Sequence, residues 1–341
     1  MTDYTPSTMN TEGPIVPRGA AYFDVNAQGT AREFAFLLLP QFTLLAFSAA
    51  LDPLRIANQL AQRPLYRWSA YSEDGAAVTS SCGMTVSVDM AMDTFPQNAH
   101  AFVCAGTVHE FDASHKTMSA LRRHAKHGGI VGGVCTGAIT LARAGILRGK
   151  RATLHWENQP AFREEFPDQE ISTAIYEIDG KVLTCGGGVA STDMMLTLVE
   201  EDFGPQFALA VADMCVYGGR RAQNAHQRSS LSVLLGSRNS KLVEIGRLMH
   251  ENIEDPLPLA ELCCRVGVSR RQVERLFLKY LNTSPLQYYR GLRLDHARAL
   301  LRETDMSITE VGLASGFSSD SAFLKGFRSR FGISPSKFRG T

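Results

Sequence analysis

GFSSDSAFLKGFRSRFGISPSKFR, from Gly316 to Arg339, is the stretch of sequence that decides the fold of the C-terminal third of the chain. A second stretch of the same design, GVSRRQVERLFLKYLNTSPLQYYR, runs from Gly267 to Arg290. In both stretches a Gly is followed by an apolar residue, a Ser and a basic helical pattern, and Ser-Pro with an aromatic residue closes the copy. Gly permits a left-handed turn between two helices, and Ser caps the helix that follows. The repeat therefore predicts two helix-turn-helix units.

The second helix of each unit is expected to enter the major groove of DNA. In the first unit its polar residues lie opposite Val273, Leu276 and Phe277, so they face outward. Contacts to base edges are predicted for Arg270, Arg271, Glu274 and Arg275 in the first unit and for Asp320, Ser321, Leu324 and Lys325 in the second. Contacts to phosphates are predicted for Arg302, Arg328, Arg330, Lys337 and Arg339. The alternative is an ordinary helical bundle with basic faces, which two aligned copies disfavour.

This region resembles the AraC/XylS family of regulators. The resemblance implies two reading helices, joined by one long helix at about Leu286–Arg302, that enter successive major-groove segments of double-stranded operator DNA. Charge agrees with this expectation: the chain from Lys241 onward is basic and the rest is acidic, although the net charge of the whole is only +1. Further helices are predicted by apolar periodicity at Lys241–Asn252, Leu259–Val266, Arg270–Tyr280, Ile308–Ala314 and Asp320–Phe331.

Short apolar runs alternate with helical patterns over the preceding part of the chain. Buried strands are predicted at Phe34–Leu39, around Val103, at Ile130–Val134 and at Val182–Thr184, and helices at Leu44–Ala61, His115–His127, Thr136–Ala144 and Ser191–Asp202. Strands and helices in turn indicate a doubly wound, mostly parallel α/β sheet, here followed by an all-α domain with two helix-turn-helix units. Ligands of such sheets bind beyond the carboxyl ends of the strands.

Composition predicts the domain boundaries. With 341 residues, of which 44% are hydrophobic, the chain can form two cores. We predict a flexible arm at 1–32, an α/β domain at 33–217, a linker rich in Gly, Arg, Gln and Ser at 218–239 and the DNA-binding domain at 240–341.

The stretch GGIVGGVCTGAITLARAGIL, from Gly128 to Leu147, places Cys135 in a Gly-flanked turn between a buried strand and a helix. This is the layout of a nucleophile elbow, and a helix N-terminus lowers the pKa of a thiol beside it. His155, in the segment ATLHWE, could face the sulfur. Cys135 and His155 are therefore candidates for a thiol site or for the floor of a ligand pocket.

From about Phe34 to Val216 the chain is similar to the PfpI-type branch of the glutamine-amidotransferase-like fold. That resemblance implies an acidic residue near the helix after the first strand, directed at the cysteine, but Ala46 stands at about this position. We therefore expect no catalytic residue and an enzyme-like fold reused for ligand sensing. The combination with an AraC-type tail resembles the GlxA-like class of regulators, whose architecture implies effector sensing.

The segment LTCGGGVASTDMML, from Leu183 to Leu196, resembles a loop of class members that respond to glycine betaine, carnitine or arginine. Its glycines allow a ligand to approach the backbone, and the next helix begins with side chains suited to a carboxylate, so Gly186, Gly187, Ser191 and Thr192 are predicted ligand contacts. A quaternary ammonium group would also need aromatic faces, for which Trp156 and Phe42 are the candidates.

The remaining expectations concern partners and location. The seven cysteines show no CxxC pair and no His at metal-ligand spacing, so we expect a reducing compartment, no metal and no cofactor. No stretch is apolar enough to span a bilayer, which predicts a cytoplasmic protein without a membrane partner. The resemblance implies a homodimeric activator that binds operator DNA and a small-molecule effector and contacts RNA polymerase. A thiol-dependent hydrolase or amidase with a DNA-localising tail, and a constitutive nucleoid-binding protein, are the alternatives.

Overall fold

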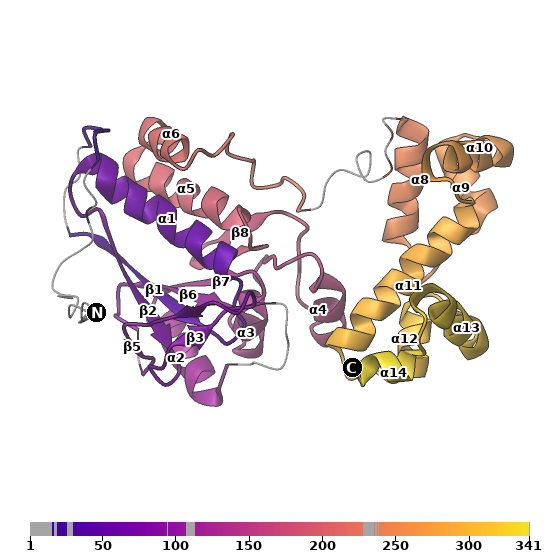
Figure 1. Ribbon diagram of the computed structural model, residues 1–341, viewed down its shortest axis with the longest axis horizontal. Helices are drawn as coiled ribbons and strands as arrows, with labels where there is room; N and C mark the ends of the chain where they lie inside the picture. Colours follow the sequence, from indigo (N-terminus) through magenta and orange to yellow (C-terminus); the bar gives the residue numbers. More distant parts are fainter. Residues whose placement is uncertain are drawn as a thin grey trace, which may run out of the picture. The chain divides into compact units, whose positions relative to one another are not determined.

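The computed structural model describes residues 16, 19–25, 30–93, 95–106, 113–227, 235, 237 and 239–340. The chain divides into two compact units (Figure 1). The α/β unit comprises Met1–His155 and Gln169–Ala225, and the helical unit comprises Trp156–Asp168 and His226–Thr341. A short segment in the middle of the sequence, Trp156–Asp168, therefore packs with the C-terminal helices.

A seven-stranded sheet forms the centre of the α/β unit, in the order β5-β2-β1-β6-β7-β9-β8. Every neighbouring pair is parallel except β8 and β9, which are antiparallel. The strands are β1 (Arg32–Leu38), β2 (Tyr66–Ser72), β5 (Met90–Ala91), β6 (His100–Cys104), β7 (Ile130–Val134), β8 (Tyr176–Asp179) and β9 (Val182–Cys185), and a separate antiparallel pair is formed by β3 (Val78–Thr79) and β4 (Thr85–Val86). The expected doubly wound α/β sheet is confirmed.

Two groups of helices cover this sheet (Figure 1). One group contains α1 (Leu44–Ala61), α5 (Ala190–Phe203) and α6 (Pro205–Met214), which pack on one another, and the other contains α2 (His115–Lys126) and α3 (Gly137–Arg143), which pack against β7. Stacked rings of Phe34, Phe36 and Phe102, from neighbouring strands β1 and β6, fill the core beneath α1. Strands buried on both faces read as continuous apolar runs, which is why β1, β6, β7 and β9 were predictable.

Both segments that were expected to flank the α/β domain are partly bound to it. Within the predicted arm, the Phe23 N–H donates to the Leu60 carbonyl (2.9 Å), and the Phe23 ring contacts Phe207. Within the predicted linker, Ala225 accepts a hydrogen bond from the Ile175 N–H (2.9 Å). The α/β unit therefore extends beyond residue 217, to Ala225, and residues 228–234, 236 and 238 of the expected linker lie outside the described residues.

Over the described residues 239–340, seven helices follow the linker, and α4 (Gln159–Glu165) joins them in the helical unit. They are α8 (Ser240–Glu251), α9 (Leu259–Val266), α10 (Arg270–Leu281), α11 (Pro285–Glu303), α12 (Ile308–Ala314), α13 (Asp320–Phe331) and α14 (Pro335–Arg339). One apolar core surrounds Phe277 on α10 and a second surrounds Phe327 on α13. The long helix α11 contributes Tyr289 to the first core and Leu294 to the second, so it joins the two halves.

The repeat in the sequence becomes a repeat in structure. Gly267 ends α9 with φ of 68°, and Gly316 follows α12 with φ of 74°, so both turns use the left-handed conformation that glycine tolerates. Ser269 caps α10 in a capping box with Gln272, and Ser319 caps α13 by accepting the Ala322 N–H. The two predicted helix-turn-helix units are confirmed.

None of the helices in the described part of the chain has the length and apolar character needed to cross a bilayer.

Candidate functional site

The two helices that follow the turns, α10 and α13, present the predicted base-reading side chains to solvent. Val273 and Phe277 on α10, and Phe323 and Phe327 on α13, are fully buried. The residues predicted to read bases lie on the opposite faces and are all exposed: Arg270, Arg271, Glu274 and Arg275 on α10, and Asp320, Ser321, Leu324 and Lys325 on α13. The core therefore fixes the orientation of each helix and directs these side chains outward.

The two exposed faces differ in chemistry. The α10 face carries three arginines, of which Arg270 pairs with Glu274 at 2.9 Å. The α13 face begins with Asp320, which accepts a hydrogen bond from the Thr309 hydroxyl (3.1 Å), and also exposes Leu324. Arginine suits guanine edges, whereas an acidic residue suits cytosine and an apolar residue suits the thymine methyl group. The two helices thus expose faces of different chemistry.

The residues predicted to contact phosphates are also exposed: Arg302, Arg328, Arg330, Lys337 and Arg339. Arg330 differs from the rest, because its Nε and Nη2 atoms bind both carboxylate oxygens of Asp295 on α11, at 3.0 and 2.7 Å. A phosphate would have to compete with this bidentate pair. Arg330 therefore acts within the protein as a tie between α13 and α11.

The second candidate site is the elbow after β7. Cys135 adopts φ of 61°, a left-handed conformation that is uncommon for a residue other than glycine. Its N–H donates to the Cys185 carbonyl (3.1 Å) at the end of β9, and its side chain is 2% exposed. A strained residue between a strand and a helix is the backbone geometry of a nucleophile elbow.

Loops after three strands meet at Cys135. From the loop after β1, the Thr43 hydroxyl donates to the Cys135 Sγ at 3.6 Å. From the loop after β9, Gly187 approaches so closely that an added Cβ would lie 2.7 Å from the Cys135 Cβ. His155 is joined through its backbone, since its N–H donates to the Cys135 carbonyl (3.3 Å). The structure thus brings Cys135, Gly187 and the backbone of His155 together.

Thr43 was not predicted, although it immediately precedes the helix that begins at Leu44. It occupies the N-cap position of α1, yet its side chain makes no capping hydrogen bond and instead contacts the thiol. Ala46, one turn later, is fully buried in the core. A hydroxyl donor therefore faces the sulfur where the resemblance implies a carboxylate, and a hydroxyl at neutral pH is a poor general base.

The aromatic candidates for an ammonium cage do not meet at the elbow within the α/β unit. Phe42 is fully buried in the core, where its ring packs edge-on against Phe47 at 5.8 Å. Trp156 is 41% exposed and belongs to the helical unit, where it lines a cavity of about 510 Å³ with His250 and His296. Phe42 is therefore a core residue, and Trp156 belongs to a different unit from Cys135.

The glycine-rich loop after β9 is held mainly by bonds within the protein. The Gly186 N–H donates to the Ile175 carbonyl (2.8 Å), and the Thr192 hydroxyl donates to the Ala49 carbonyl (3.1 Å). Ser191 is fully buried, with its Oγ 3.4 Å from the Cys185 Sγ. The side chains of Ser191 and Thr192 therefore fasten the start of α5, which leaves the backbone of Gly187 as the part of the loop beside Cys135.

Asp193, in the first turn of α5, was also missed by the sequence analysis. It is fully buried, and its carboxylate accepts hydrogen bonds from Arg221 and from the Tyr217 hydroxyl (2.8 Å). Arg221 lies in the segment predicted as a linker. This pair could not be predicted, because only folding brings Asp193 and Arg221 together.

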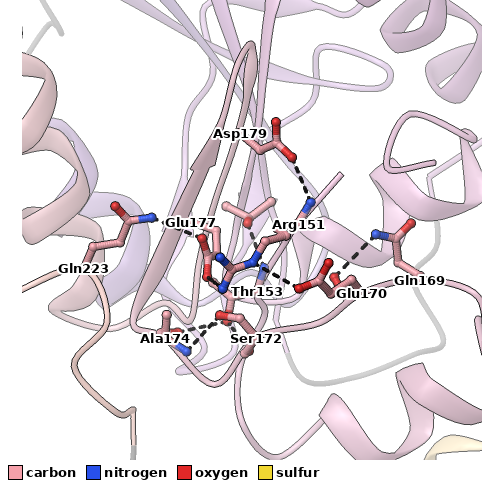
Figure 2. Close-up of polar contacts among 10 residues, drawn as sticks. Arg151, Thr153, Gln169, Glu170, Ser172, Ala174, Glu177, Asp179 and Gln223 are labelled. Carbon is pink, nitrogen blue, oxygen red and sulfur yellow. Dashed lines mark hydrogen bonds and ion pairs between the residues drawn. The ribbon is translucent and has the colours of Figure 1, made fainter. Parts of the chain in front are cut away.

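Figure 2 shows a second attachment of the same segment. The buried carboxylate of Glu177, on β8, accepts hydrogen bonds from Arg151 (3.2 Å) and from Gln223 (3.1 Å). The Thr153 hydroxyl, two residues beyond Arg151, donates to the Ala174 carbonyl at 2.9 Å. These contacts fix the strand-like segment that leads to His155 and tie residue 223 to the α/β unit.

Among the described residues, no group of three or more His, Cys, Asp or Glu side chains could hold a metal ion, and all seven cysteines are free thiols. Burial raises the pKa of Cys104 and of Cys185, which end β6 and β9.

Comparison with known proteins agrees with both halves of the structure. Residues 262–341 match the model of the helix-turn-helix domain, and residues 49–201 match the model of the DJ-1/PfpI family. The HTH-type transcriptional regulator CdhR of Pseudomonas aeruginosa is 42% identical over 309 residues, which cover 91% of this chain and 92% of the relative. The chain belongs to this family of HTH-type transcriptional regulators.

Two further similarities support the assignment. The HTH-type transcriptional regulator GbdR of Pseudomonas aeruginosa is 43% identical to this regulator, over 89% of its chain and 83% of the relative. A crystal structure of an AraC family transcriptional regulator from Pseudomonas putida is 26% identical, with a TM-score of 0.50, and covers 54% of the regulator and 99% of the solved chain. The regulator is therefore a DNA-binding protein that carries a PfpI-like fold.

Proposed function

We propose that this regulator reads a two-part operator through α10 and α13 and that a small metabolite bound at the Cys135 elbow controls its activity. The observation that carries the first part is the repeated geometry of the helical unit. Two capped helices each bury one apolar face in a core and expose the opposite polar face, and a single helix, α11, joins both cores. Such units place the second helix in a major groove.

The operator can be obtained by selection with the full-length protein from a random duplex library. We expect Arg275→Ala and Lys325→Ala to weaken binding to that operator by about 1–3 kcal/mol each, because each loses a base contact. Binding to random DNA should change little. Arg247→Ala is the matched control, because Arg247 lies on α8 and pairs with Glu244 and Glu251. Equal losses on operator and on random DNA would assign Arg275 or Lys325 to phosphate contact instead.

The position of Cys135 supports an effector site. The sheet changes its winding direction between β1 and β6, and ligands of doubly wound sheets bind at such a switch point beyond the strand ends. Thr43, Cys135 and Gly187 follow the strands β1, β7 and β9 on either side of this point. We propose a small zwitterion as the effector, with glycine betaine, carnitine and arginine as the compounds to test.

Thermal unfolding of the full-length protein with each of these compounds tests the effector proposal. We expect one of them to raise Tm, because a ligand that binds only the folded state stabilises it. Hydrogen exchange with that compound should then show protection of the peptides around Cys135, His155 and Gly187. No change in Tm with any compound, or protection confined to the cavity lined by Trp156, would contradict an effector site at the elbow.

We further propose that the regulator is a cytoplasmic homodimer that activates transcription through contact with RNA polymerase. Support comes from the kind of regulator to which it belongs, and dimerisation through the α/β unit would leave the helical unit available to DNA. Sedimentation of the full-length protein tests the dimer, and a reporter driven by the selected operator tests the sign of regulation. A monomer, or a reporter repressed by the protein, would contradict the corresponding part.

A further inference from the structure

The turn of the second helix-turn-helix unit lies directly on the first unit. A Cβ atom added to Gly316 would be 2.4 Å from the Ile253 carbonyl oxygen and 2.9 Å from the Glu254 carbonyl oxygen. Ile253 and Glu254 belong to the loop between α8 and α9. Gly316 also has φ of 74°. Glycine is therefore needed here for two reasons, the backbone conformation and the close approach of a neighbouring loop.

Arg293 on α11 fastens this contact. Its Nη1 donates to the Gly316 carbonyl at 2.9 Å, and its guanidinium lies over the Phe317 ring at 4.8 Å. The guanidinium also lies over the Tyr289 ring, at 5.6 Å from the ring centroid. Cation-π contacts of a partly desolvated arginine are stabilising and orient the planar group. One arginine thus connects α11 to the turn of the second unit.

Tyr289 carries the connection into the first unit. Its ring is buried in the first core, its hydroxyl donates to the Asn252 carbonyl, and the Leu257 N–H donates to the same hydroxyl at 3.2 Å. Asn252 and Leu257 flank the loop that Gly316 touches. Gly316, Arg293, Tyr289 and this loop therefore form a closed set of contacts, which we call the inter-unit joint.

We propose that the inter-unit joint sets the spacing that the operator must have between its two half-sites. The inference rests on the proposed reading of DNA by α10 and α13. One added base pair moves a half-site along the duplex by about 3.4 Å and rotates it by about 35°, because one turn spans about 34–36 Å and 10–10.5 base pairs. A joint that holds the two reading helices rigidly can accept only one such spacing, and a loosened joint accepts several.

The test measures affinity of the full-length protein for the selected operator and for duplexes with one base pair added or removed between the half-sites. For the wild type we expect a loss of about tenfold or more with either change, since each displaces the base contacts of one helix. Gly316→Ala should flatten this dependence to about threefold or less, because its Cβ displaces the loop at Ile253. Gly267→Ala is the matched control: Gly267 has φ of 68°, but an added Cβ meets nothing within 4 Å. Gly267→Ala therefore introduces the same backbone strain as Gly316→Ala, but its affinity should depend on half-site spacing as strongly as that of the wild type.

Arg293→Ala and Arg293→Lys test the same joint without backbone strain. We expect Arg293→Ala to accept several spacings and Arg293→Lys to show an intermediate dependence, because lysine keeps the charge but loses the planar contact with both rings. Circular dichroism melts establish that each variant is folded. If folded Gly316→Ala and Arg293→Ala both kept the wild-type dependence of affinity on spacing, the role of the inter-unit joint would be overturned. The proposed function would not be affected by that result. Failure of the wild type to select any two-part operator would instead overturn the proposed function.

Discussion

Arg221 binds the buried carboxylate of Asp193 with its side chain and its backbone at the same time. The Nε and Nη2 atoms lie 3.0 and 2.8 Å from the Asp193 Oδ2, and the Arg221 N–H lies 2.8 Å from Oδ1. Asp193 is in the first turn of α5, six residues after the Gly187 that touches Cys135. Arg221, near the C-terminal end of the α/β unit, is therefore fixed to the helix that follows the elbow loop.

Replacing Arg221 by Ala should lower the free energy of unfolding by about 3 kcal/mol, because a buried carboxylate loses its charged partner. The neighbouring Arg220 offers a matched control: its partner Glu200 is 34% exposed, so Arg220→Ala should cost less than about 1 kcal/mol. Urea unfolding of both variants measures the difference. Equal effects of the two substitutions would show that Asp193 does not depend on Arg221.

Gly187→Ala should destabilise the elbow more than Gly188→Ala. Both glycines have positive φ, but only at Gly187 would a Cβ collide with Cys135, whereas nothing lies within 4 Å of a Cβ at Gly188. We expect a cost of about 1 kcal/mol at Gly188, from backbone strain alone, and about 3 kcal/mol or more at Gly187.

Adding Cys135→Gly to Gly187→Ala checks the cause of that difference. The second substitution removes the Cβ and Sγ atoms in the collision, so part of the lost stability should return, which a double-mutant cycle measures. Strictly additive free energies of unfolding would rule out a steric contact between the two residues.

His100 should make the α/β unit sensitive to acid. Burial, with a smaller contribution from the charges of Arg32 and His124, lowers the pKa of His100 to about 4. Its Nδ1 has no hydrogen-bond partner among the described residues. His100 binds a proton near pH 6.5 in the unfolded chain but not in the folded one. The free energy of unfolding is therefore highest above pH 6.5 and falls as the pH drops from 6.5 towards 4.

His100→Phe removes this titration while keeping an apolar ring beside Phe34. Relative to its value at pH 7.5, the unfolding free energy of the wild type should fall by about 2 kcal/mol more than that of the variant at pH 5. Parallel pH profiles for the two proteins, from chemical unfolding at each pH, would contradict a buried neutral His100.

Thiol labelling should separate the cysteines by environment. A hydrogen bond with the Ser80 hydroxyl lowers the pKa of the exposed Cys82 thiol, whereas burial raises the pKa of Cys104 and Cys185. We expect iodoacetamide at neutral pH to modify Cys82 at least about tenfold faster than the two buried thiols in the native protein. Ser80→Ala should slow the reaction at Cys82, and mass spectrometry of peptides gives each rate. Modification of Cys104 as fast as Cys82 would be inconsistent with the described core.

Much of the fold could be predicted because local signals agreed with tertiary structure. The bounds of α1, α9, α12, α13 and β7 match those expected from apolar periodicity and turn residues. The strands β2 and β8 were missed because YRWSAYS and YEID lack the continuous apolar runs from which the central strands were predicted. The short helices α4 and α14 lack a full apolar period.

The site residues also fall into those that local sequence patterns predict and those that only the folded structure reveals. The outward faces of α10 and α13 follow from helix periodicity, and Cys135 follows from its strand-turn-helix pattern. Thr43 beside the thiol, Arg221 on Asp193 and Arg293 on Gly316 could not be predicted, because each contact joins residues that only the folded chain brings together. Phe42 was predicted to contact a ligand because it lies in a loop after a strand, but it is part of the core.

Equilibrium binding of the full-length protein to its selected operator, at about 0.15 M salt, tests the central claim that α10 and α13 act together on DNA. We predict that the operator binds about 10³-fold or more tightly than random duplexes, and that scrambling either half-site alone removes most of this preference. Equal affinity for the operator, the scrambled duplexes and random DNA would contradict the claim.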